Sequence, residues 1–220
     1  MKETYFTTES IERKATELLR RTQHISRGSI DNLRPRRSAL LIMDMQKYFL
    51  KPDSHAFIPS AGAILPGLTE LLREYHQRSL PVFLTRHTNT AANAGRMADW
   101  WQELICPDDP LSELNNELTA VGGVILEKNQ YDAFHGTRLE ETLRTRQVTQ
   151  IVIGGLMTHL CCETTARSAF CRGFEVFFTV DGTATYNEQF HRASLQNLAH
   201  GFATMVSVPQ LLAVLRNHAD

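Results

Sequence analysis

The chain has 220 residues, of which 42% are hydrophobic and 21% are charged, and this composition excludes disorder as its main state. Lysine and arginine number 23 and aspartate and glutamate 24, so the formal net charge of −1 provides no positive field for nucleic acid or for an anionic membrane. We therefore expect neither of these partners. A chain of this length can bury one sizeable core, which favours a single domain.

The cysteines and the lengths of the apolar runs indicate the cellular compartment of the protein. The four cysteines show no C-x-x-C framework, and the adjacent Cys161 and Cys162 could close a disulfide only with strain. We expect free thiols and therefore a reducing compartment. The longest apolar runs are far shorter than the ~20 residues that span a bilayer, and the first residues contain no apolar signal region. These features predict a cytoplasmic protein.

The first 37 residues differ from the rest in charge, with nine basic and five acidic side chains. Residues 9–21 have the period of an amphipathic helix, and Pro35 ends any helix in the basic run that follows. We predict that residues 1–37 form a basic N-terminal helical extension. Packing on its own domain or on a neighbouring subunit is favoured over a dedicated anion-binding arm, which stays open as an alternative.

After residue 37, short apolar runs alternate with longer stretches that have the 3.6-residue period of a helix. Strands without a polar face need helices on both sides, and strand–helix alternation supplies them. The pattern predicts a single-domain, three-layer α/β/α sandwich over residues 38–220, with a mainly parallel, six-stranded, Rossmann-like sheet. The expected strands are 39–43, 81–85, 123–127, 150–153, 175–180 and 203–206, and the expected helices are 64–77, 137–144, 163–172, 188–199 and 209–217.

Three of these strands run directly into residues that can carry chemistry: Asp44, Lys128 and, after a Gly-Gly turn, Cys161. Each has an ordinary explanation when taken alone, as a helix cap, a surface lysine and an inert buried thiol. Parallel strands bring their carboxyl ends to one edge of a sheet, where α/β proteins bind ligands. The combination therefore favours an active site at this edge.

The residue types suit nucleophilic acyl transfer. Cys161 precedes a helical pattern, so backbone N–H groups and the helix dipole are expected to lower its pKa. Asp44 could accept the thiol proton and return it to a leaving amine, while Lys128 would keep the carboxylate ionised. Backbone N–H groups of the same turn could bind a developing oxyanion.

The sequence resembles the isochorismatase-like hydrolases, also called cysteine hydrolases, in three ordered blocks at residues 39–49, 127–134 and 155–167. The resemblance implies a catalytic triad of Asp44, Lys128 and Cys161. It also implies a cis peptide bond between Leu156 and Met157, and an oxyanion hole formed by the N–H groups of Met157 and Cys161. A homodimer or homotetramer is implied as well.

The chain differs from each of two subfamilies at one motif. Members that hydrolyse nicotinamide usually have a metal site with an Asp-x-His motif after the second strand. This chain has His87-Thr88-Asn89 at that place, so we expect neither a metal nor another cofactor. True isochorismatases resemble the chain at other positions but have glycine where Cys161 stands. The expected pocket residues, chosen by motif position and aromatic character, are Phe49, His87, Trp101, Tyr131 and Phe134.

These observations predict a hydrolase that cleaves a C–N bond of a small amide or carbamoyl substrate through a thioester on Cys161. The alternative is an isochorismatase-type vinyl-ether hydrolase that uses Asp44 and Lys128 without a covalent intermediate. A non-catalytic binding or assembly module is a third possibility. A nucleotide-binding protein is disfavoured because the first strand is not followed by a Gly-x-Gly-x-x-Gly turn.

Overall fold

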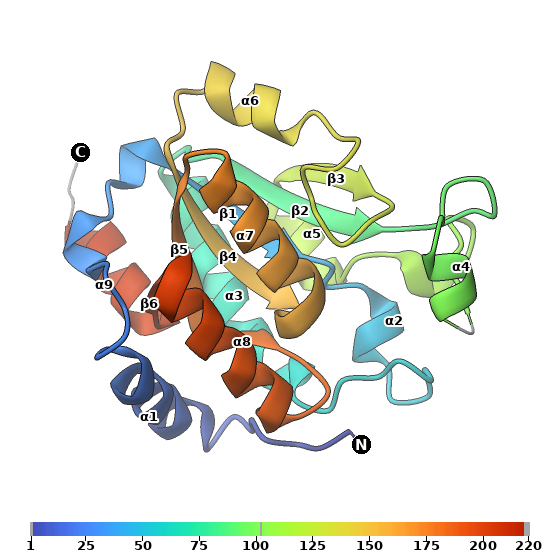
Figure 1. The fold of residues 1–220 in the computed structure, drawn as a ribbon, viewed down its shortest axis with the longest axis horizontal. Helices are drawn as coiled ribbons and strands as arrows, with labels where there is room; N and C mark the ends of the chain where they lie inside the picture. Colours follow the sequence, from blue (N-terminus) through green and yellow to red (C-terminus); the bar gives the residue numbers. More distant parts are fainter. Residues whose placement is uncertain (1, 102, 218–220) are drawn as a thin grey trace.

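Six parallel strands form one sheet in the order β3-β2-β1-β4-β5-β6 (Figure 1). The computed structural model describes residues 2–101 and 103–217. This order is that of a doubly wound Rossmann-like sheet, so the predicted fold class is confirmed. The strands are β1 (Ser38–Met43), β2 (Val82–His87), β3 (Val124–Lys128), β4 (Gln150–Leu156), β5 (Glu175–Ala184) and β6 (Thr204–Val206).

Helices cover both faces of the sheet. The helices α3 and α9 pack on one face of β5, whereas α7 packs on the other face and contacts α8, which packs on β6 (Figure 1). No described helix is both long and apolar enough to cross a membrane. The helices are α1 (Ile11–Thr22), α2 (Lys47–Leu50), α3 (Ala61–Gln77), α4 (Met97–Trp100), α5 (Asn116–Val121), α6 (Leu139–Thr145), α7 (Glu163–Cys171), α8 (Glu188–Gly201) and α9 (Val208–Asn217).

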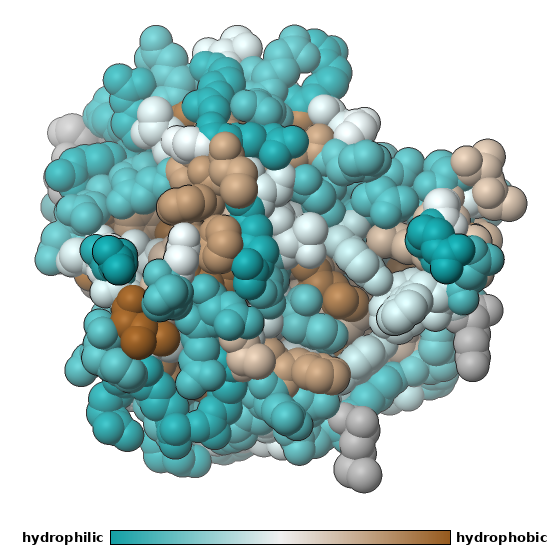
Figure 2. All heavy atoms as spheres, in the orientation of Figure 1, coloured by the Kyte–Doolittle hydropathy of each residue, from teal (hydrophilic) through white to brown (hydrophobic). Residues whose placement is uncertain are grey.

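The core lies on both sides of the central strands. Every residue of β1 and β4 is buried, as their continuous apolar sequences require in a parallel sheet. The face of the molecule drawn in Figure 2 is mainly hydrophilic, and apolar side chains form separate groups on it.

Four strands, β2, β3, β4 and β5, continue beyond their predicted ends, and β5 does so by the most residues. The apolar run of β5 stops at Val180, yet the strand reaches Ala184 because its buried polar side chains are satisfied internally. The hydroxyl of Thr179 donates to the Ile153 carbonyl at 2.8 Å, and Asp181 accepts the Val208 N–H at 2.8 Å. Hydrophobic periodicity cannot detect a strand whose polar groups are paired in this way.

The N-terminal extension packs on its own chain. Helix α1 lies against β5 and α8, and Lys14 on α1 forms an ion pair with Glu188 at 2.7 Å. Ahead of this helix, Tyr5 and Phe6 are 5% and 1% exposed and belong to the main hydrophobic core. The extension is therefore part of the folded unit, in one of the two environments that the sequence favours.

Gly155 on β4 allows β1 and β4 to approach closely next to the residues that follow both strands. It pairs with Met43 and has a φ of +106°, and a Cβ at this position would overlap the Met43 backbone. Glycine alone meets both the conformational and the steric requirement.

We expect Gly155→Ala to lower the free energy of unfolding by about 3 kcal/mol or more, because backbone strain and overlap add. Gly136→Ala is the matched control, since Gly136 also has a positive φ of +66° but open space around it. The control should lose only about 1–2 kcal/mol. Urea denaturation measures both, and equal losses would contradict the role assigned to the strand contact.

Candidate active site

Asp44, Lys128 and Cys161 meet at the carboxyl ends of three strands. Asp44 directly follows β1, Lys128 is the last residue of β3, and Cys161 lies in a π-helical turn, Thr158–Cys162, after β4. The Lys128 ammonium lies 2.8 Å from Asp44 Oδ2 and 3.3 Å from Cys161 Sγ. A carboxylate oxygen of Asp44 lies within 4.8 Å of the Cys161 sulfur. The topology thus brings together the three residues named from the sequence.

The carboxylate of Asp44 is fixed from the neighbouring strand. Asp44 has a φ of +47°, which aspartate adopts more readily than most residues. Its backbone N–H donates to the Thr85 hydroxyl at 3.0 Å, and the same hydroxyl donates to Asp44 Oδ1 at 2.6 Å. One oxygen of the carboxylate is thereby held by Thr85, while the other faces Lys128.

His87 is a further partner of the ammonium. Lys128 Nζ lies 3.1 Å from His87 Nδ1 and donates to the carbonyl of Gln130 at 3.1 Å. Because the ammonium can only donate, Nδ1 accepts, and the proton of the neutral ring is on Nε2, which donates to Asn89 Oδ1 at 2.7 Å. Burial, reinforced by the charge of Lys128, lowers the pKa of His87 to about 4. His87 is therefore a neutral acceptor at physiological pH.

Three residues of this site have side chains of the types that bind metal ions. Among the described residues, Asp44, His87 and Cys161 place one ligand atom each within 4.8 Å of one another. The Lys128 ammonium contacts all three of these atoms. A fixed positive charge thus already satisfies the donor set that a cation would need, and these residues do not fit a metal centre.

Burial reverses the pKa shift expected for Cys161. Burial of the Cys161 thiol, with the charge of Asp44 acting in the same direction, raises its pKa to about 12, although Lys128 opposes the shift. The lowered pKa expected from the sequence is therefore wrong, because desolvation outweighs the helix terminus. The same neighbours act oppositely on Lys128: burial favours loss of its proton, but Asp44 and Cys161 raise its pKa above the ordinary value.

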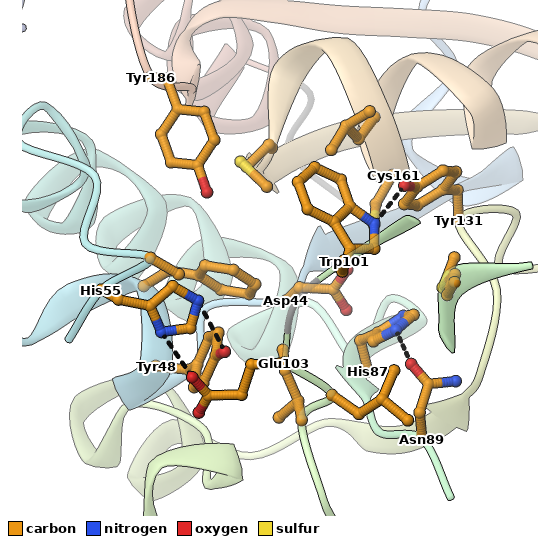
Figure 3. Close-up of a pocket in the computed structure, with 17 residues that line it drawn as sticks. Asp44, Tyr48, His55, His87, Asn89, Trp101, Glu103, Tyr131, Cys161 and Tyr186 are labelled. Atoms are coloured by element: carbon orange, nitrogen blue, oxygen red, sulfur yellow. Dashed lines mark hydrogen bonds and ion pairs between the residues drawn. The ribbon is translucent and has the colours of Figure 1, made fainter. Parts of the chain in front are cut away.

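A pocket of about 90 Å³ opens over the Cys161 side of the cluster (Figure 3). Four of the five expected pocket residues, Phe49, His87, Trp101 and Tyr131, line it. Its other lining residues are Asp44, Tyr48, His55, Ala56, Asn89, Met97, Glu103, Leu104, Ile105, Met157, Leu160, Cys161 and Tyr186. The small volume suits a ligand below drug size.

Phe134, the fifth expected pocket residue, lies outside the pocket. Its ring stacks on Phe174 at 6.0 Å between centroids, and the Arg172 guanidinium lies 4.9 Å from the ring centroid. Motif position placed Phe134 near the site, but its contacts come from the segment that follows α7. The aromatic ring serves packing there.

Sequence reasoning missed the polar side of the pocket. Tyr48 Oη lies 3.2 Å from His55 Nε2, and His55 Nδ1 lies 3.0 Å from Glu103 (Figure 3). On the opposite side, Trp101 Nε1 donates to Tyr131 Oη at 2.8 Å. Tyr48 could have been found from its place beside Phe49 in the first motif, whereas His55 and Glu103 lie in loops without any motif signal.

Comparison with known proteins identifies the family. The isochorismatase domain model matches residues 38–210, which is most of the chain. The chain belongs to the isochorismatase family. Nicotinamidase 3 of Arabidopsis thaliana is 38% identical over 180 residues, covering 79% of this chain and 86% of that protein. Enterobactin synthase component B of Escherichia coli K12 is 29% identical over 181 residues, and the match spans 81% of this chain but only 63% of that protein.

Solved structures agree with this assignment. A cysteine hydrolase from Pseudomonas syringae pv. phaseolicola 1448A superposes with a TM-score of 0.80 at 27% identity, covering 84% of this chain and 95% of that one. The protein is therefore an isochorismatase-family hydrolase. The Leu156–Met157 peptide bond, which the resemblance singled out, is cis, and Met157 lies beside Cys161 in the pocket lining.

We expect Cys161 to react with iodoacetamide at pH 7 more slowly than the exposed Cys106 and Cys171, because the buried thiol keeps its proton. Asp44→Asn removes a charge that raises the pKa of Cys161 and should speed its labelling, whereas Lys128→Met should slow it further. Peptide-resolved mass spectrometry gives each rate. Fastest labelling at Cys161 in the wild type would instead support the low pKa expected from the sequence.

Proposed function

We propose that the protein hydrolyses the C–N bond of a small, uncharged carboxamide through a thioester on Cys161. The observation that carries the proposal is the position of the Cys161 thiol at the pocket lining, 3.3 Å from the Lys128 ammonium and within 4.8 Å of an Asp44 carboxylate oxygen. The 38% identity to a nicotinamidase supports an amide as the substrate class. Asp44 is the proposed acid and base, and Lys128 its electrostatic partner.

In the first half-reaction, Asp44 removes the thiol proton as Cys161 Sγ bonds to the amide carbon. A raised thiol pKa makes this transfer necessary, since little thiolate exists beforehand. The tetrahedral oxyanion is proposed to accept hydrogen bonds from the N–H groups of Met157 and Cys161. When the C–N bond breaks, Asp44 returns the proton to nitrogen, so ammonia leaves and a thioester remains.

In the second half-reaction, water attacks the thioester carbon while Asp44 accepts a proton from it. Collapse of the new tetrahedral intermediate breaks the C–S bond, and the proton passes from Asp44 to the Cys161 sulfur. One amide and one water thus give one carboxylic acid and one ammonia. Lys128 stays positively charged throughout, which keeps Asp44 ionised between proton transfers.

The charge of the pocket favours an uncharged substrate. None of the described residues that line it is arginine or lysine, and Glu103 adds a negative charge. A carboxylate entering the pocket would lose hydration without gaining a cationic partner. The rings of Phe49, Trp101 and Tyr131 offer apolar surface for a planar group.

The alternative substrate is isochorismate, and the observation that favours it is similarity to other relatives. Enterobactin synthase component B of Escherichia coli K12 and an isochorismatase of Bacillus subtilis are each 29% identical to the chain. Isochorismate carries two carboxylates, which the pocket does not match. A non-catalytic module is disfavoured by membership of a hydrolase family. The homodimer or homotetramer that the resemblance implies stays a prediction.

We expect Cys161→Ala to reduce amide hydrolysis to background, because no thioester can form, and Asp44→Asn to lower kcat by about 10²- to 10⁴-fold. Ammonia release from nicotinamide and related carboxamides measures both, with circular dichroism as the check on folding. Retained activity of Cys161→Ala toward isochorismate, together with inactivity of the wild type toward every amide, would overturn the proposal in favour of vinyl-ether cleavage.

We also expect kcat/KM to be higher for nicotinamide than for N-carbamoylsarcosine, an amide that carries a carboxylate. Glu103→Gln should narrow this difference by removing a negative charge from the pocket lining. Ala193→Gln, on the exposed side of α8, is a control that should leave the ratio unchanged. A preference for the carboxylate-bearing substrate in the wild type would show that the charge argument is wrong.

A further inference from the structure

Residues 2–6, here called the 2–6 segment, belong to no helix or strand and precede the matched family domain, but they are firmly anchored to it. The backbone N–H groups of Tyr5 and Phe6 both donate to the Ser60 hydroxyl, each at 3.0 Å. Ser60 immediately precedes α3, and the two aromatic side chains are buried. The segment therefore has a fixed position relative to the sheet.

The 2–6 segment contacts the loop that follows β5. The Glu3 N–H donates to the Tyr186 carbonyl at 2.8 Å, and Tyr5 Oη accepts the Thr185 N–H at 2.9 Å. These bonds hold the backbone on both sides of the peptide that links Thr185 to Tyr186. Tyr186 lines the pocket, so the segment supports one of its walls.

Lys2 connects the pocket wall that contains Tyr186 to the wall that contains His55. Its ammonium donates to the His55 carbonyl and lies 4.9 Å from the centroid of the Tyr186 ring. His55 and Tyr186 both line the pocket, and Figure 3 shows them projecting from separate loops on the same side of it. A single side chain thus bridges two wall loops that are more than one hundred residues apart in the sequence.

A third contact reaches the turn that carries the nucleophile. Tyr5 and Phe6 each pack on the His191 ring with 5.3 Å between centroids. His191 Nδ1 lies 3.0 Å from the hydroxyl of Thr158, the first residue of the π-helical turn that contains Cys161. The buried part of the segment therefore supports the base of the site, while Lys2 spans its walls.

We propose that the 2–6 segment is a positioning element of the substrate pocket, in which Lys2 fixes the spacing between the His55 and Tyr186 walls and so sets substrate fit. Neither Lys2 nor Tyr5 lines the pocket, so both act through the residues that do. Loss of the Lys2 contacts should weaken substrate binding and leave the chemical step at Cys161 unchanged. The kinetic part of this inference rests on the proposed amide hydrolysis.

The test compares Lys2→Met with Lys14→Met, a matched control that instead breaks the ion pair between Lys14 on α1 and Glu188 on α8. A cation–π contact at an exposed site is worth a factor of about two to five in binding. We expect KM for nicotinamide to rise by about that factor in Lys2→Met, with kcat changed less than about twofold. Tyr5→Phe, which removes only the hydroxyl that accepts Thr185 N–H, should change KM in the same direction.

A second readout needs no substrate. The rates at which iodoacetamide and the bulkier N-phenylmaleimide label Cys161 report the width of the pocket. Lys2→Met should raise the maleimide-to-iodoacetamide ratio, and Lys14→Met should not. An unchanged ratio and an unchanged KM, or a fall in kcat alone, would overturn the inference. If the wild type hydrolyses no carboxamide, the proposed function fails, and the labelling ratio still decides the role of Lys2.

Discussion

The structure of the site depends on one buried ammonium. Lys128 is almost fully buried with Asp44, and transfer of such charges from water costs on the order of several kcal/mol per ion. That cost is offset by partners supplied from different parts of the sheet: the Asp44 carboxylate, the His87 ring, the Gln130 carbonyl and the Cys161 thiol. The parallel sheet matters for function because it holds these groups around a single charge.

This arrangement determines how the chemistry can run. A fixed ammonium provides the positive charge that a bound cation supplies in other hydrolases, and neutral His87 completes its coordination without adding a second charge. The ion pair of Asp44 and Lys128 has no net charge, so the pocket beside it can be apolar. Burial raises the pKa of Cys161, so in the proposed mechanism the thiol keeps its proton until Asp44 removes it.

Substrate choice has a different physical origin from the reaction itself. The candidate catalytic groups lie at strand ends or in the turn that follows β4, whereas the pocket walls come from loops that contain His55, Trp101, Tyr131 and Tyr186. Loops can change without disturbing the sheet, so the pocket walls can vary while the residues at the strand ends stay in place. In this chain the walls also depend on the 2–6 segment, which the family domain does not include.

The sequence by itself determined the sheet and the residues at its edge. Apolar runs that end in Asp44 and Lys128 are local patterns that can be read directly, and parallel strands bring such ends together. It did not determine the environment of Cys161 or the place of Phe134. The pKa of a thiol depends on how completely distant segments exclude water, and Phe134 is held by Phe174, forty residues further along the chain. Likewise, only the tertiary structure shows that Lys2 reaches His55 and Tyr186, because no local pattern encodes contacts between loops.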